Sequence, residues 1–302
     1  MEKIGLVTVT YNSEDVLSGF LDSSLKQTFT NFIIYIIDNN SNDDTLKIID
    51  SYSDSRIKLY RNNQNLGVAK ANNQGIKSAI MDDCSHVLII NNDVKFEFKM
   101  LDKMLKIQKE ENCSLVVPKM MYFDQPKLIW YAGSSFDKRK GFLPIHNGQK
   151  QIDNGQFDGI RRVEYAPTCC LLVKKEVFHD IGYMDEKYFV YFDDTDFSYR
   201  IFKDDRHKIV FFSNVDFYHK IGSLSKSIVI NKVEIYRGDF FIKQNTRNHI
   251  YFLKKIGTVY AYLFIIFLFF KNNIRVITNK NFRTSFHTWK IINQSYFEGL
   301  LM

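Results

Sequence analysis

The first apolar run of the chain is Ile4-Gly5-Leu6-Val7-Thr8-Val9-Thr10-Tyr11-Asn12, and the second is Phe32-Ile33-Ile34-Tyr35-Ile36-Ile37-Asp38. Between them, residues 14–28 carry apolar side chains at helical spacing. The alternation continues with a helix expected at 43–54, a strand at 57–61, a helix at 67–81 and a strand at 87–90. Strands that are apolar throughout are typical of a parallel sheet covered by helices on both faces. This stretch therefore predicts an α/β fold with a doubly wound, mostly parallel sheet.

The pattern becomes mixed after residue 110. We expect strands at 115–118, 128–132 and 163–173, a short helix from Lys174, a helix from Asp193 to Lys203 and a strand at 209–212. From Val233 onward the chain is helical in character, and it is almost wholly apolar from Ile256 to Phe270. We therefore expect one folded unit over residues 1–230 and a helical C-terminal extension over residues 231–302.

The excess of basic over acidic residues comes from this extension. The formal net charge is +7, yet the region from Phe240 to Phe297 contains no Asp or Glu and nine basic residues: Lys243, Arg247, Lys254, Lys255, Lys271, Arg275, Lys280, Arg283 and Lys290. Subtracting these nine charges from +7 leaves −2 for the remainder. A slightly acidic body has no general attraction for phosphate backbones, so we exclude a nucleic-acid binder.

Cysteine usage and the first residues point to the cytoplasm. The four cysteines, Cys84, Cys113, Cys169 and Cys170, show no C-x-x-C spacing, and the adjacent pair cannot form an ordinary disulfide. Residues 4–12 are too short and too polar at their end for a signal peptide. We expect buried thiols in a reducing compartment and a cytoplasmic protein.

Polar residues follow several of the expected strands. They are Thr10-Tyr11-Asn12, the segment 38–45 and Asn91-Asn92-Asp93. In doubly wound sheets ligands bind beyond the carboxyl ends of the strands, so these segments form the expected ligand edge. Neither a G-x-G-x-x-G after the first strand nor a G-x-x-x-x-G-K-[ST] occurs, which argues against binding of NAD or ATP by these motifs.

Asp93 and His219 are the candidate metal ligands. A hard cation such as Mg²⁺ or Mn²⁺ takes one or two carboxylates together with substrate phosphate oxygens, and Asp93 follows a strand end. The alternative for Asn91-Asn92-Asp93 is an Asx turn that closes the strand. A neutral imidazole binds Mn²⁺ readily, so His219 is the second candidate, although a lone histidine is more often structural.

An acidic cluster lies among aromatic residues in the segment Tyr191–Tyr199. It contains Asp193, Asp194 and Asp196, with Arg200 one helical turn beyond Asp196. Burial beside aromatic rings and like charges raises a carboxylate pKa, which suits a general base; the alternative is an acidic helix cap. The small residues of segment 65–75 allow close approach of either a substrate diphosphate or the chain's own sheet.

Taken in order, these segments resemble glycosyltransferase family 2, whose members are inverting enzymes with the GT-A fold, and most closely its bacterial rhamnosyltransferase-type branch. The resemblance covers roughly residues 3–225 and rests on Val9-Thr10-Tyr11-Asn12, the segments 37–45 and 65–75, Ile90-Asn91-Asn92-Asp93-Val94, the segment 191–196 and Tyr218-His219-Lys220-Ile221-Gly222-Ser223. It implies a nucleotide-sugar half over about 1–95 and an acceptor half over about 96–230.

The resemblance also implies roles for individual residues. The donor nucleotide and its sugar would be bound by Thr10, Tyr11, Asn12, Asp38, Ser41, Asn65, Gly67, Lys70, Asn73, Asn92 and Asp93. Within this set Tyr11 would stack on the base and Asp38 would accept from its imide N–H. Asp93, with His219, would bind Mn²⁺ or Mg²⁺, which stabilises the departing diphosphate.

Asp194 matches the family's base, which takes the proton from the acceptor hydroxyl in a single inverting displacement. Asp193, Asp196 and Arg200 would support it, and Asp193 is the alternative base because it stands where the family usually has Glu. Asn91 and Asn92 depart from the family's acidic metal motif. The run Ala166-Pro167-Thr168-Cys169-Cys170 replaces a small-residue run with Gly and marks a difference on the acceptor side.

The segment 256–270 is fifteen residues without a charge, shorter than the roughly 20 that a spanning helix needs. With Lys254, Lys255 and Lys271 beside it, it predicts an interfacial helix on an anionic cytoplasmic membrane surface; the alternative is a buried helix or a dimer contact. We therefore expect transfer of a sugar from dTDP-rhamnose or a UDP-hexose to a surface polysaccharide or lipid-linked glycan. The alternative is a non-catalytic glycan-binding protein that keeps the fold.

Overall fold

The computed structural model describes residues 2–220, 238–278 and 286–302. The two opening apolar runs form strands β1 (Ile4–Thr10) and β2 (Phe32–Asp38), which pair in parallel. Strand β4 (His86–Ile90) pairs in parallel with the other side of β1, and β3 (Ile57–Arg61) pairs in parallel with β2. The expected parallel half of the sheet is therefore confirmed, and it brings the ends of β1, β2 and β4 to one edge.

The remaining four strands make the sheet mixed. They are β6 (Leu115–Pro118), β11 (Ile160–Val163), β12 (Cys170–Lys174) and β13 (Ile209–Phe212), and the full order is β11-β13-β6-β12-β4-β1-β2-β3. Strand β12 runs antiparallel to both β4 and β6. The predicted single strand at 163–173 is wrong: its ends belong to β11 and β12, which are not neighbours in the sheet. Pro167 lies between them and has no N–H to donate to a ladder.

Six helices accompany this sheet: α1 (Leu17–Leu25), α2 (Thr45–Ser51), α3 (Val68–Met81), α4 (Met100–Glu110), α5 (Lys175–Asp180) and α6 (Asp193–Asp204). Helix α3 packs closely on β1 and β2. A Cβ added at Gly75 would lie 2.4 Å from Val7 Cγ1, and one added at Gly5 would lie 2.4 Å from Ala79 Cβ. Part of the small-residue segment 65–75 therefore serves the packing of α3 on the sheet.

A second, four-stranded sheet carries the later candidate residues. Its strands are β5 (Val94–Phe96), β14 (Phe217–His219), β7 (Met120–Tyr122) and β8 (Ile129–Tyr131), in that order. Strands β9 (Ser134–Asp137) and β10 (Leu143–His146) form a hairpin, joined through the short helix η1 (Lys138–Lys140). Because β5 directly follows Asp93 and pairs with β14, this sheet brings Asp93 and His219 together.

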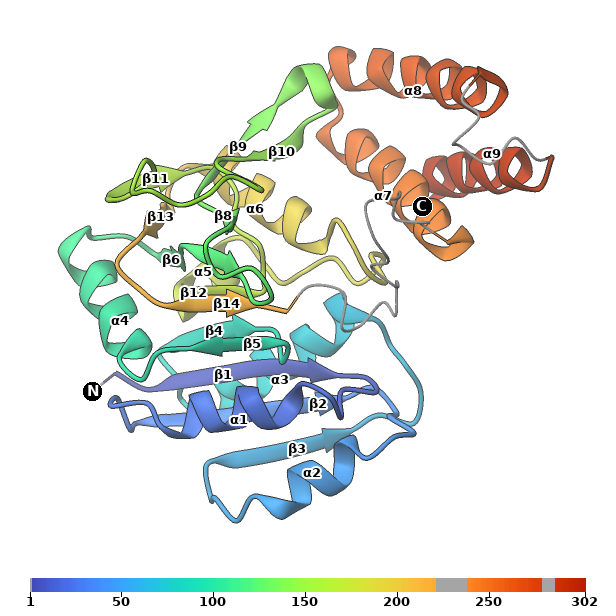
Figure 1. Ribbon diagram of the computed structural model, residues 1–302. Helices are drawn as coiled ribbons and strands as arrows, with labels where there is room; N and C mark the ends of the chain where they lie inside the picture. Colours follow the sequence, from blue (N-terminus) through green and yellow to red (C-terminus); the bar gives the residue numbers. More distant parts are fainter. Residues whose placement is uncertain (1, 221–237, 279–285) are drawn as a thin grey trace.

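Three helices form the C-terminal extension, drawn in orange and red at one end of the molecule in Figure 1. They are α7 (Asp239–Ile256), α8 (Val259–Thr278) and α9 (Phe286–Leu301), and α7 packs against both others. Buried residues of α7 and α8 pack in one apolar cluster with Phe142, Tyr188 and Phe192 of the body. The expected domain boundary at 230/231 and the helical start at Val233 lie outside the described residues.

The apolar segment 256–270 is divided between two helices. Ile256 ends α7, Gly257 follows in the left-handed conformation at φ 67°, and α8 then runs for 20 residues from Val259 to Thr278. Its mean hydropathy is 1.4, and in the described part of the chain it is the one helix long and apolar enough to cross a membrane. The uncharged segment is therefore only part of a helix that reaches the roughly 20 residues of a membrane span, because the helix continues past Phe270.

Candidate active site

Three predicted donor-binding residues meet at the ends of β1 and β2. The carboxylate of Asp38, which is 1% exposed, accepts hydrogen bonds from Thr10 Oγ1 at 2.8 Å and from Ser41 Oγ at 2.6 Å. It also accepts from the backbone N–H of Ser41 at 3.0 Å. A buried carboxylate with three donors is well satisfied, so Asp38 fixes the shape of this edge.

Asn12 and Asn92 tie the neighbouring loops together. The side-chain oxygen of Asn12 accepts from the N–H of Asn42 at 2.9 Å, and Asn92 Nδ2 donates to the carbonyl of Val9 at 2.7 Å. Tyr11 lies at the same edge with 41% of its side chain exposed, which leaves the ring accessible to a stacking partner. The structure thus gathers all five residues predicted here from 10–12, 38 and 41, with Asn92 beside them.

Asp93 and His219 are in contact. His219 Nε2 lies 3.2 Å from Asp93 Oδ1, and the two residues are only 5% and 8% exposed. His219 Nδ1 is buried and has no hydrogen-bond partner among the described residues. No three His, Cys, Asp or Glu side chains converge on one point in residues 2–220, 238–278 and 286–302. A carboxylate and an imidazole that touch one another nevertheless suit Mn²⁺ or Mg²⁺ when phosphate oxygens complete the coordination, so these residues fit the ion.

Asp194 lies in the first turn of α6 and is held by two hydroxyl groups. Tyr165 Oη donates to Asp194 Oδ2 at 2.7 Å, and Thr195 Oγ1 donates to Oδ1 at 3.2 Å. Burial raises the pKa of Asp194, and burial together with the adjacent Asp194 charge raises the pKa of Asp193. A carboxylate with a raised pKa accepts a proton more readily, as a general base must.

The candidate base and the candidate cation ligands are neighbours. Burial raises the pKa of the Cys169 thiol, and the charges of Cys170, Asp93 and Asp194 raise it further. Asp93 and Asp194 are far apart in sequence, but ring contacts connect them. The ring of His219 lies 4.7 Å from that of Trp130, and the ring of Trp130 lies 5.7 Å from that of His146. The His146 ring lies 5.5 Å from that of Tyr165, which donates to Asp194. The Cys169 carbonyl accepts from the N–H of Asn91 at 3.1 Å, so the run 166–170 lies beside the loop that carries Asp93.

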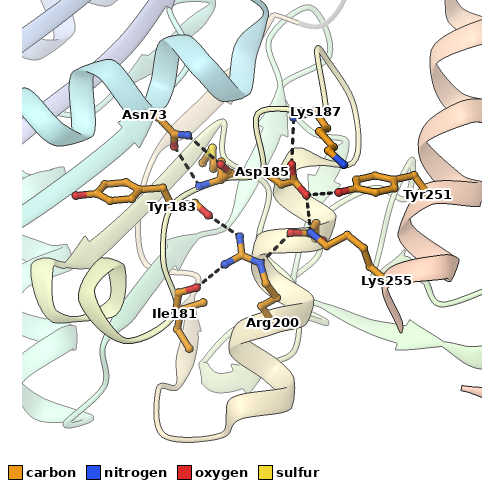
Figure 2. Close-up of polar contacts among 10 residues, drawn as sticks. Asn73, Ile181, Tyr183, Asp185, Lys187, Arg200, Tyr251 and Lys255 are labelled. Carbon is orange, nitrogen blue, oxygen red and sulfur yellow. Dashed lines mark hydrogen bonds and ion pairs between the residues drawn. The ribbon is translucent and has the colours of Figure 1, made fainter. Parts of the chain in front are cut away.

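Asp196 and Arg200 form an ion pair that contacts the loop before α6. Arg200 Nε lies 2.9 Å from Asp196 Oδ2, as the i,i+4 spacing predicts, and its two other nitrogens donate to the carbonyls of Ile181 and Tyr183 at 2.7 Å. Figure 2 shows this arrangement. The pair anchors the loop of residues 181–192, which we call the bridging loop. We therefore assign Asp196 and Arg200 to positioning of the loop and of α6.

The bridging loop is also bound to the nucleotide half. Asn73 accepts from the N–H of Met184 at 3.1 Å and donates to its carbonyl at 2.9 Å (Figure 2). The N–H of Val68 donates to the carbonyl of Phe189 at 2.6 Å. Asn73 uses its amide for the loop, so its contact with a donor stays a prediction.

Gly67 is placed by the same loop. It has φ 82°, and a Cβ at this position would lie 2.4 Å from the carbonyl oxygen of Phe189. Asn65 Oδ1 accepts from the Gly67 N–H at 2.9 Å, while Lys70 is exposed on the first turn of α3. The close approach that segment 65–75 allows is therefore to the bridging loop and the sheet.

Lys255 of α7 is a residue that the sequence analysis misplaced. Its Nζ lies 2.6 Å from Asp196 Oδ1 and 2.7 Å from Asp185 Oδ2, so it forms two ion pairs within the protein (Figure 2). The physical reason is that Asp196 is only 2% exposed and a buried carboxylate requires a compensating charge. Lys254 likewise donates to the carbonyl of Leu300 at 2.7 Å.

We expect Lys255→Met to destabilise the protein by about 2 kcal/mol, because it leaves the buried Asp196 with one cation instead of two. Lys254→Met is the matched control and should have a smaller effect, since it removes a single bond to a backbone carbonyl. Urea unfolding measures both. The double variant Lys255→Met/Asp196→Asn should recover part of the loss; equal destabilisation by the two single variants would contradict this account.

Comparisons with known proteins show which proteins the chain is similar to. A family model described as glycosyl transferase family 2 matches residues 6–182. The dTDP-rhamnosyl transferase RfbF of Shigella flexneri is 28% identical over 195 residues, which cover 64% of this chain and 61% of that protein. The UDP-Glc:alpha-D-GlcNAc-diphosphoundecaprenol beta-1,3-glucosyltransferase WfaP of Escherichia coli is 39% identical over 79 residues, covering 26% and 32%.

The low-salt glycan biosynthesis hexosyltransferase Agl10 of Haloferax volcanii is 22% identical over 204 residues, covering 66% of this chain and 62% of that protein. The chain thus spans less than two thirds of the length of each of these curated relatives. Among solved structures, S. aureus TarS 1-349 matches with a TM-score of 0.60 at 18% identity, covering 98% of this chain and 80% of that one. GalNAc-T7 with UDP, GalNAc and Mn2+ matches with a TM-score of 0.61 at 15% identity, covering 82% and 47%. The chain has a GT-A-like α/β fold with a mixed sheet and C-terminal helices.

Proposed function

Because the chain belongs to glycosyl transferase family 2, we propose that it transfers one sugar from a nucleotide diphosphate sugar to a hydroxyl group of a glycan, with inversion. The observation that carries this proposal is a series of contacts that connects two groups. The groups are the Asp93–His219 pair, 3.2 Å apart, and the half-buried Asp194. The contacts run from His219 through Trp130 and His146 to Tyr165, which donates to Asp194. One group suits the diphosphate and the other suits the acceptor hydroxyl.

Asp194 acts as the base in this proposal. Its carboxylate takes the proton of the acceptor hydroxyl while that oxygen attacks the anomeric carbon from the face opposite the diphosphate. The new C–O bond forms as the bond to the diphosphate breaks, and the electron pair leaves with the diphosphate. Tyr165 donates to Asp194 Oδ2 at 2.7 Å and so keeps the carboxylate oriented during the transfer.

Asp93 and His219 would hold Mn²⁺ or Mg²⁺, which when bound neutralises charge on the departing diphosphate. The nucleotide would lie along the edge formed by Thr10, Asp38 and Ser41, with its base against the exposed ring of Tyr11. The donors we propose are dTDP-rhamnose and a UDP-hexose. They are supported by the relatives RfbF, named for dTDP-rhamnose, and WfaP, named for UDP-glucose.

Calorimetric titration with UDP and with dTDP, each with and without Mn²⁺, tests the donor assignment. We expect at least one nucleoside diphosphate to bind, and to bind more tightly with Mn²⁺. If neither nucleotide binds under either condition, the donor site is not where we place it.

For the acceptor we propose a surface polysaccharide or a lipid-linked glycan at the cytoplasmic face of a membrane, which the peripheral enzyme contacts through α8. Helix α8 buries Ala261, Phe264, Ile265 and Leu268 against its neighbours. It exposes a second apolar stripe that includes Val259, Leu263, Ile266, Phe270 and Ile277, beside the exposed Lys271 and Arg275. A helix that packs along one side and exposes apolar and basic side chains on the other suits the surface of an anionic bilayer.

We expect the protein to sediment with vesicles that contain anionic lipid, and the double variant Leu263→Glu/Phe270→Glu to sediment at least ten-fold more weakly. These side chains are 60% and 59% exposed, so the fold is preserved. Met81→Glu/Ile152→Glu is the matched control, because its side chains are equally apolar and 83% and 65% exposed on the body. Unchanged sedimentation of the α8 variant would refute the proposed contact.

A second candidate function is favoured by one observation. Asn91 and Asn92 leave Asp93 as the single carboxylate of its motif, which is compatible with a glycan-binding protein that keeps the fold without catalysis. Such a protein binds a glycan but releases no nucleoside diphosphate from any donor, so turnover separates the two candidates.

A further inference from the structure

Trp130 lies beside the candidate active site but has no role in the mechanism proposed above. It lies in β8, where the flanking Ile129 and Tyr131 are fully buried and Trp130 itself is half-buried. Its ring centroid is 4.7 Å from that of His219, at an interplanar angle of 84°. The indole therefore sits directly beside the candidate cation pair.

The other side of Trp130 leads to the candidate base. Its ring centroid lies 5.7 Å from that of His146, and the His146 ring lies 5.5 Å from that of Tyr165. Tyr165 in turn donates to Asp194 at 2.7 Å. Trp130 and His146 thus connect the two groups through successive ring contacts.

The ring contacts of Trp130 leave it suited to a further partner. Within the described chain they are edge-on at 84° and 85° or tilted at 44°, so no ring there stacks parallel on the indole. The faces of aromatic rings carry partial negative charge and attract the C–H groups of sugar rings, while the polar hydroxyls project sideways.

His146 supplies a second and independent observation. Its Nδ1 is buried and has no hydrogen-bond partner among the described residues. A buried polar atom without a partner is unfavourable, so such an atom marks a place for a ligand or an ordered water. The neutral imidazole can donate a hydrogen bond to a sugar hydroxyl group or accept one from it.

We propose that Trp130 and His146 form the subsite for the acceptor sugar, with the pyranose ring on the indole and one hydroxyl directed to the imidazole. This inference rests on the proposed function, because it names what binds between Asp93–His219 and Asp194. A sugar bound by these two side chains lies between the diphosphate held at Asp93–His219 and the base Asp194, as an attacking acceptor must.

The chain offers a direct spectroscopic test, because Trp130 and Trp289 are its two tryptophans. In Trp289→Phe, Trp130 is the sole indole fluorophore. The probes are the methyl glycosides of glucose, galactose, N-acetylglucosamine and rhamnose, titrated in the presence of UDP or dTDP with Mn²⁺. We expect at least one glycoside to change the Trp130 emission saturably. No change with any of the four would overturn the proposal.

The second arm measures affinity in the otherwise native chain. Trp130→Ala should weaken binding of that glycoside by about ten-fold, and Trp130→Phe should weaken it less because a flat ring remains. Trp289→Ala, which removes a 40% exposed indole from α9, is the matched control and should bind like the native protein. Equal affinity of Trp130→Ala and the native chain would refute the subsite.

Nucleotide binding separates this inference from the proposed function. UDP or dTDP should bind to Trp130→Ala as it binds to the native chain, which shows that the variant is folded. If the native chain binds neither nucleotide, the proposed function fails; if nucleotides bind and Trp130→Ala leaves glycoside affinity unchanged, the subsite alone fails.

Discussion

Asp194→Asn is expected to lower turnover by about a hundred- to ten-thousand-fold while binding of the nucleotide donor persists. The amide keeps the shape of the side chain and its contact region with Tyr165, but it cannot take a proton from the acceptor. Release of the nucleoside diphosphate in the presence of acceptor measures turnover, and calorimetry with UDP or dTDP measures binding. An equal loss of nucleotide binding would contradict the assignment.

Asp193→Asn is the matched control for this experiment. Asp193 is the adjacent carboxylate, 4% exposed, and burial raises its pKa as it does that of Asp194. If Asp194 is the base, Asp193→Asn retains most of the turnover. If Asp193→Asn is the more damaging change, Asp193 is the base instead.

The pH profile gives a further readout of the same residue. The base must be unprotonated, so activity falls as the pH drops through its pKa, and burial places that pKa above the usual value for Asp. The hydrogen bond from Tyr165 stabilises the ionised form and lowers the pKa. Tyr165→Phe should therefore shift the acidic limb to higher pH. A shift to lower pH would contradict the role of this contact.

Asp93→Ala is expected to lower turnover by about a hundred- to thousand-fold and to remove the effect of Mn²⁺ on nucleotide binding. It takes away the single carboxylate of the pair with His219, whose nitrogen lies 3.2 Å from it. Asp124→Ala removes an exposed carboxylate near the end of β7 and should behave like the native chain. His219→Ala should show a smaller loss in the same direction. Native levels of Mn²⁺-dependent binding in Asp93→Ala would place the ion elsewhere.

The fold was predictable where local pattern determines structure. The apolar runs expected as strands at 4–11, 32–38 and 87–90 form the parallel strands β1, β2 and β4, because each is apolar and rich in β-branched residues. The segment 163–173 was misread as one strand because its apolar character continues through Ala166. Strands β11 and β12 run in the same direction but are separated in the sheet by β13 and β6, so the chain crosses over within this segment. Hydropathy alone does not reveal this crossover.

The sequence predicts that several candidate residues lie close together, but it does not predict all of their contacts. Thr10, Asp38 and Ser41 are close because parallel strands end at one edge, which is a general property of such sheets. Lys255, by contrast, pairs with a carboxylate on a helix that lies 59 positions earlier in the sequence. Its neighbours in sequence are apolar and basic, which favoured a membrane surface. The signal for an ion pair of Lys255 within the protein is the group of acidic residues in the first turn of α6, which requires compensating cations.

The most direct test of the account is release of nucleoside diphosphate from a panel of donors. The full chain is incubated with Mn²⁺ and, separately, with dTDP-rhamnose, UDP-glucose and UDP-galactose. We expect release from at least one donor, and loss of that release in both Asp93→Ala and Asp194→Asn. No release from any donor by a folded protein that still binds UDP or dTDP would contradict it, and would favour the glycan-binding alternative.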